Sequence, residues 1–71
     1  MSILHERLRE LRKSKNLTNE AAAEGIGISV RAYRHYETGD REPNVDTLIA
    51  LADYFGVSVD YLIGVMNKDS E

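Results

Sequence analysis

The sequence has 71 residues, of which 42% are hydrophobic, and nine basic against twelve acidic residues give a net charge of −3. One small domain fits this length, and the hydrophobic content is too high for a disordered chain. The absence of cysteine excludes disulfides, thiolate metal sites and a thiol nucleophile. No apolar run is long enough to span a membrane, and the first residues do not resemble a signal peptide, so we expect a cytoplasmic protein.

Apolar residues at helical spacing predict a first amphipathic helix from Ile3 to about residues 14–16, with basic residues in its last turn. Thr18 is a good N-cap for a second helix over residues 19–25, which contains three consecutive alanines. Gly25 weakens that helix, and Gly27 is the expected stop because glycine tolerates a positive φ.

Ser29 and Gly39 bound a third helix over residues 30–38, and a loop follows up to Pro43. Asn44 caps a fourth helix that ends at Gly56. We expect its buried stripe to contain Val45, Leu48, Ile49, Leu51, Ala52 and Phe55.

A short fifth helix runs from Ser58 to Gly64. No segment alternates apolar and polar residues as a strand does, so the sequence predicts an all-α, compact five-helix bundle. We expect one domain over residues 1–66, followed by a polar C-terminal tail over residues 67–71.

The spacing within residues 18–38 is typical of a helix-turn-helix, because two short helices flank a tight turn at Gly27–Ser29. Ala22 and Ala23 allow close approach of the two helices, and Tyr33 and Tyr36 point inward. The second helix of such a unit can enter a DNA major groove. Its opposite face contains side chains that suit base contacts, namely Val30, Arg31, Arg34, His35 and Thr38. The alternative is an exposed helix that is only solvated.

The charges are unevenly distributed along the chain. Residues 1–41 contain eight basic and six acidic side chains, a net of +2, whereas residues 42–71 contain one and six, a net of −5. A polyanion meets the local surface rather than the net charge, so the first half can still attract phosphate. These charges would otherwise be ordinary solvated helix faces.

Three longer motifs carry a family resemblance. They are Leu17-Thr-Asn-Glu-Ala-Ala-Ala-Glu-Gly-Ile-Gly-Ile-Ser, Tyr36-Glu-Thr-Gly and Asn44-Val-Asp-Thr-Leu-Ile-Ala-Leu-Ala-Asp-Tyr-Phe-Gly-Val-Ser. From about Ile3 to Gly64 the chain resembles the Cro and phage-repressor (XRE-like) type of helix-turn-helix protein. The resemblance implies a lambda-repressor-like DNA-binding domain.

The resemblance also implies roles for individual residues. It places base contacts on Val30, Arg31, Arg34 and His35, and phosphate contacts on Asn19, Ser29, Thr38 and Arg41. Asn19 stands where the family usually has glutamine, and Ala22 where it has leucine, so the ring of Tyr33 is expected to fill the missing volume. Phage members pair a helix 1 arginine with a glutamate of the recognition helix, which implies a structural ion pair between Arg12 and Glu37.

The apolar residues after the fourth helix exceed what a short fifth helix needs to bury. One interpretation is a twofold dimer through Val57, Val59, Ile63, Val65 and Met66. The other is that Leu62 and two neighbours simply complete the core. A dimer would place two recognition helices about 34 Å apart, facing a palindromic operator.

The sequence therefore predicts a sequence-specific DNA-binding transcriptional regulator, a repressor that binds double-stranded DNA as a homodimer. The alternative is a protein-interaction module such as an antitoxin or an anti-repressor partner. We expect no enzyme, no cofactor and no metal site, since His5 and His35 have no second ligand at metal spacing. Regulation would come from concentration, a partner protein or the dimer equilibrium.

Overall fold

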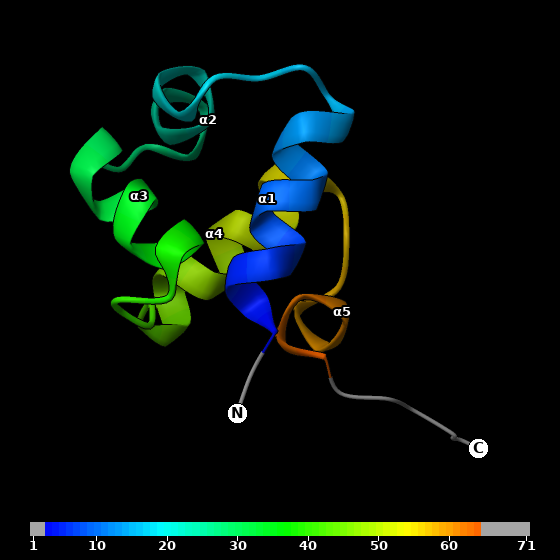
Figure 1. Ribbon diagram of the computed structural model, residues 1–71. Helices are drawn as coiled ribbons and strands as arrows, with labels where there is room; N and C mark the ends of the chain where they lie inside the picture. The colour runs from blue at the N-terminus through cyan, green and yellow to red at the C-terminus, as the bar shows by residue number, and fades with distance from the viewer. Residues whose placement is uncertain (1–2, 65–71) are drawn as a thin grey trace.

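Five α-helices follow one another with short connections in the computed structural model, which describes residues 3–64 (Figure 1). The bounds are α1 Leu4–Ser14, α2 Asn19–Ile26, α3 Val30–Thr38, α4 Val45–Phe55 and α5 Val59–Ile63. The predicted all-α class and the five helices are confirmed over this range. The expected dimer residues Val65 and Met66 and the tail 67–71 lie outside the described residues.

Local capping explains why the predicted helix bounds agree so closely with the structure. The side chains of Thr18, Ser29, Asn44 and Ser58 each accept a hydrogen bond from the backbone N–H three residues later, at 2.8–3.0 Å. Each of these helices ends at a glycine in the left-handed conformation. In the α2–α3 turn this glycine is Gly27, whose φ of 95° disfavours any residue with a Cβ.

The arrangement of the helices leaves one face of α3 uncovered. Helix α3 packs against α1 and α2, α4 packs against α2 and α5, and α5 also packs against α1. In Figure 1, α3 lies at the edge of the molecule on the side away from α5. Its inner face is therefore held by two helices, while its outer face is open.

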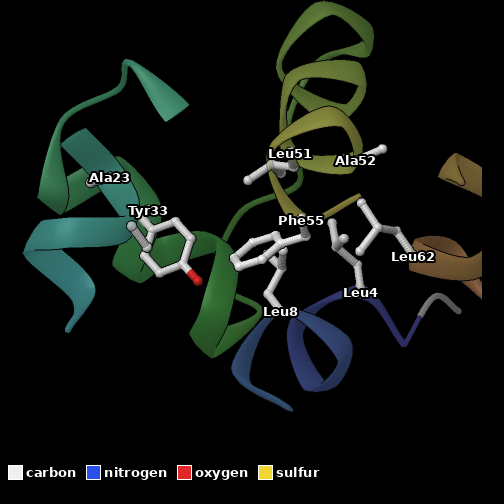
Figure 2. Close-up of a cluster of buried hydrophobic side chains, with 9 residues drawn as sticks. Leu4, Leu8, Ala23, Tyr33, Leu51, Ala52, Phe55 and Leu62 are labelled. Atoms are coloured by element: carbon white, nitrogen blue, oxygen red, sulfur yellow. The ribbon is translucent and has the colours of Figure 1, made fainter. Parts of the chain in front are cut away.

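The core contains one large aromatic side chain from α3. Tyr33 is fully buried and lies between Ala23 on one side and Leu8 and Phe55 on the other (Figure 2). Ala22 is also fully buried. The buried apolar residues are Leu4, Leu8, Ala22, Ala23, Tyr33, Leu51, Ala52, Phe55 and Leu62.

Two residues assigned to the buried stripe of α4 are instead exposed. Val45 is 70% exposed and Ile49 is 48% exposed. The buried positions of the helix are Leu51, Ala52 and Phe55, and the turns of an α-helix place Val45 and Ile49 at the margin of that arc. The expected stripe was thus too wide, and these two residues leave apolar surface in contact with solvent.

The presence of glycine at position 25 is explained by a tertiary contact that could not be predicted from the sequence. The ring of Tyr54 in α4 packs directly over the α2 backbone, so that a Cβ at residue 25 would lie only 2.7 Å from Tyr54 Cζ. The glycine lowers the helix propensity of α2 but permits this close contact between α2 and α4.

The Tyr33 hydroxyl is a buried polar group with no hydrogen-bond partner among residues 3–64. Burial, and to a lesser degree the nearby Glu37 carboxylate, strongly raise its pKa above the ordinary value of 10.0. The folded protein therefore keeps the Tyr33 proton at a pH where the unfolded chain loses it.

This difference predicts a loss of stability in alkali. Above about pH 10 the free energy of unfolding should fall by about 1.4 kcal/mol per pH unit from Tyr33 alone, because only the unfolded state releases that proton. Urea denaturation from about pH 9 to about pH 11 measures the slope. Tyr33→Phe should remove this contribution and Tyr36→Phe should retain it; an unchanged slope in Tyr33→Phe would contradict the assignment.

Candidate nucleic-acid interface

The outer face of α3 gathers the side chains that the sequence assigned to base contacts. Val30, Arg31, Arg34, His35 and Thr38 line one shallow, open hollow together with Asp40, and we call these five residues of α3 the outer face. A second hollow beside it is lined by Ser29, Arg31, Ala32, His35 and Arg41. The predicted base-contacting residues therefore share one continuous surface with three of the predicted phosphate contacts, Ser29, Thr38 and Arg41.

The two arginines of this face differ in their surroundings. Arg31 is exposed and has no hydrogen-bond or ion-pair partner within the described part of the chain. Arg34 donates a hydrogen bond from Nη2 to Oε2 of Glu20 in α2, at 3.1 Å, and both side chains are more than half exposed. The contact with Glu20 could not be predicted from the sequence, because it joins two helices across the turn.

His35 and Val30 are less accessible than the arginines. His35 Nδ1 lies 3.6 Å from Asp40 Oδ2, so this acid can pair with the protonated imidazole. Val30 is half-buried and packs in part against the core. Only part of its side chain is available to a ligand.

The residues predicted to contact phosphate are available to different extents. Asn19 begins α2 with no side-chain hydrogen bond among residues 3–64, and Arg41 is exposed in the loop after α3. The Ser29 oxygen accepts from the Ala32 N–H, which leaves its hydroxyl proton free to donate. The Thr38 hydroxyl donates to the His35 carbonyl at 3.2 Å and accepts from the Asp40 N–H at 3.4 Å. Thr38 would have to give up its bond to His35 in order to donate to a phosphate.

An ion pair between α1 and α3 fixes the C-terminal end of α3. Arg12 Nε donates to Glu37 Oε2 at 2.6 Å and Arg12 Nη2 to Glu37 Oε1 at 3.2 Å, so the structure brings the two expected partners together in a bidentate pair. Arg12 Nη1 also donates to the Leu17 carbonyl at 2.9 Å. The hydrogen bond with Glu37 raises the pKa of Arg12. Both side chains are largely buried, at 16% and 8% exposed, so Arg12 is not available to a ligand.

Removing one member of this pair should destabilise the domain strongly. Glu37→Ala leaves the Arg12 guanidinium buried without its counter-charge, and we expect the free energy of unfolding to fall by about 3–5 kcal/mol. Urea denaturation followed by circular dichroism measures the change.

A control and a rescue accompany this test. Glu10→Ala removes an exposed carboxylate from α1 and should change stability by less than about 0.5 kcal/mol. The double variant Arg12→Met, Glu37→Met should recover most of the loss, because it removes both charges. A Glu37→Ala protein as stable as the parent would show that the ion pair does not hold α3.

The residues expected at a dimer surface are only partly exposed. Val57 and Val59 are half-buried and pack against the core of their own chain, and Ile63 is half-buried. Among residues 3–64, the exposed large apolar residues are instead Val45, Ile49 and Tyr61. The ring of Tyr61 also lies 4.1 Å from the Arg7 guanidinium carbon, a cation–π contact that joins α1 to α5.

Within residues 3–64 there is no cluster of three or more side chains suited to hold a metal ion. None of the helices described there has the length and apolar character needed to cross a membrane.

With this geometry established, comparison with known proteins decides the family. A family model described as Helix-turn-helix matches residues 8–62. The chain belongs to this helix-turn-helix family.

Curated relatives and solved structures agree with this assignment. The chain is 47% identical over 60 residues to YobD of Bacillus subtilis, described as an uncharacterized HTH-type transcriptional regulator, covering 84% of this chain and 54% of YobD. It is 39% identical over 61 residues to RstR of Vibrio cholerae, a cryptic phage CTXphi transcriptional repressor, covering 86% of this chain and 54% of RstR. The chain thus spans about half the length of the curated relatives it matches.

Among solved structures, the P22 c2 repressor in complex with a synthetic operator matches with a TM-score of 0.83 and 32% identity, covering 89% of this chain and 96% of that one. The resemblance to the Cro and phage-repressor type, and with it the lambda-repressor-like fold, is confirmed.

Proposed function

We propose that this chain is a sequence-specific DNA-binding transcriptional regulator, acting as a repressor in the cytoplasm, with α3 in the major groove of double-stranded DNA. The observation that carries the proposal is the outer face of α3. There Arg31 is exposed with no ion-pair partner among residues 3–64, while Tyr33 and Glu37 anchor the opposite side. A rigid helix with one anchored and one open face is the form that base recognition requires. The chemistry is binding rather than catalysis.

The relatives support this proposal. RstR is described as a transcriptional repressor, and the P22 c2 repressor was solved with a synthetic operator. On this chain, Arg31 and Arg34 would each make a bidentate contact with guanine, and the Val30 methyls would contact a thymine methyl. Occupation of the operator would block access to a promoter.

Phosphate contacts would position α3 without distinguishing sequences. Asn19 at the start of α2 and Arg41 in the loop after α3 suit this role, because neither side chain makes a hydrogen bond or ion pair within the described part of the chain. Ser29 could add a hydroxyl donor, and Thr38 could do so after leaving its present bond.

The proposal gives the two outer-face arginines a measurable role in base discrimination. Arg31→Ala should lose about 1–3 kcal/mol of discrimination at one base pair, because the guanine contact is lost. Duplexes selected from a random pool, and their single-base-pair variants, provide the probes for a titration. Lys13→Ala removes the same charge from the exposed side of α1 and should leave discrimination unchanged.

Two outcomes would oppose this function. An equal loss on selected and random duplexes would mean that Arg31 contacts only phosphate. An affinity for duplex DNA that stays flat as salt increases would favour a protein-interaction module, such as an antitoxin or an anti-repressor partner, because phosphate binding must weaken steeply with salt.

We also propose that the regulator binds a palindromic operator as a homodimer. The surface would include Val57, Val59 and Ile63 at the α4–α5 end, with Val65 and Met66 beyond it. Twofold symmetry would place two copies of α3 about 34 Å apart, one turn of DNA.

The dimer predicts two chains per duplex in a sedimentation measurement of the complex. Insertion of about five base pairs between the half-sites turns them to opposite sides of the duplex and should abolish joint binding. One chain per duplex, with no effect of spacing, would show that the monomer is the binding unit.

A further inference from the structure

The Arg34–Glu20 contact is a feature of the outer face that the proposed function does not itself explain. Arg34 lies in the middle of α3, and Glu20 is the second residue of α2. Their side chains meet at 3.1 Å across the helix-turn-helix, whereas Arg31 on the same face has no partner within residues 3–64. One of the two guanidiniums is therefore held by the protein and the other is not.

The contact contributes little to the stability of the fold. Both side chains are more than half exposed, at 59% for Arg34 and 65% for Glu20, and exposed ion pairs are screened by water and salt. The packing of α2 on α3 is already fixed by Ala22, Ala23 and Tyr33, all of which are buried. What the contact does fix is the direction of the Arg34 guanidinium.

The chemistry of the pair favours base contacts over phosphate contacts. Glu20 accepts one of the five N–H donors of the guanidinium, so the remaining donors can still face a guanine edge. An arginine that is held in place loses less freedom when it binds. The carboxylate also places a negative charge near the start of α2, where it repels a phosphate that Arg34 would otherwise attract.

We infer that Glu20 is a positioning residue that determines specificity by directing Arg34 toward bases and away from phosphates. This inference rests on the proposed function, since it assigns Glu20 a part in the same DNA-binding site. Arg31, for which residues 3–64 provide no such partner, is free to contact either a base or a phosphate. Binding through Arg34 would thus depend more strongly on the DNA sequence than binding through Arg31.

The test uses the full chain, a duplex selected from a random pool, its single-base-pair variants and a random-sequence duplex. Arg34→Ala first identifies the base pair that Arg34 recognises. Glu20→Gln should weaken discrimination at that same base pair by about two- to fivefold, the range expected for an exposed ion pair. It should leave discrimination at the Arg31 base pair unchanged. On the random duplex, the logarithmic salt slope should steepen by about 0.9, because the freed Arg34 neutralises one more phosphate.

Two further variants separate positioning from a general effect of charge. Glu24→Gln makes the same change one turn along α2, at an exposed carboxylate with no partner among residues 3–64, and should leave both measurements as in the parent. In an Arg34→Ala background, Glu20→Gln should have no further effect on discrimination. Circular dichroism melting should show that all these variants are folded.

The inference is overturned if Glu20→Gln leaves discrimination at the Arg34 base pair unchanged, or if Glu24→Gln has the same effect. It is also overturned if Glu20→Gln acts equally with and without Arg34, since the carboxylate would then repel DNA without orienting the arginine. If the parent protein selects no duplex at all, the proposed function itself fails, and the two failures are thereby distinguished.

Discussion

The ion pair between Arg12 and Glu37 is the interaction on which the position of α3 depends. It joins the last turn of α1 to the last turn of α3 through two parallel hydrogen bonds, and Arg12 also binds the Leu17 carbonyl just before α2 begins. One guanidinium therefore links α1, the start of the helix-turn-helix and its second helix. A core of this size supplies only about 3–5 kcal/mol of net stability, so a single polar contact of this kind has a large relative weight. Because both side chains are largely buried, loss of either one would leave the other as an uncompensated buried charge.

The inner face of α3 packs against the rest of the protein, whereas its outer face is exposed to solvent. A helix of nine residues is too short to be stable alone in water, so its helical structure depends on the packing of its inner face. Tyr33 and Glu37 are buried on that face, whereas Arg31 and Arg34 are exposed on the other. Two acids lie on this side of α3, Glu20 beside the Arg34 guanidinium and Asp40 beside the His35 imidazole. A net charge of −3 for the whole chain is thus compatible with a basic surface on α3. The neighbouring acids would limit the non-specific attraction of that surface for phosphate.

The sequence predicted the helices well because their ends are determined locally. Thr18, Ser29, Asn44 and Ser58 cap their helices within three residues, and such bonds require no knowledge of the tertiary fold. The features that it missed are tertiary. The exposure of Val45 and Ile49, the Tyr54 ring over Gly25 and the Glu20 contact all depend on how helices cross, which periodicity along one helix does not contain.

The same division explains why the sequence predicted which side chains share the outer face of α3 but not which neighbours they contact. Spacing on a helix determines which side chains share a face, so Arg31, Arg34 and His35 could be grouped from the sequence. Whether a grouped side chain is free depends on its neighbours from other segments. Arg34 meets Glu20 from α2 and His35 meets Asp40 from the following loop, while Arg31 meets neither. Because Arg31 and Arg34 are exposed, they can be exchanged without disturbing the buried Tyr33 and Glu37 on the inner face of α3. Under the proposed function, Glu20 and the two arginines are therefore the positions at which sequence preference would change while the scaffold stays the same.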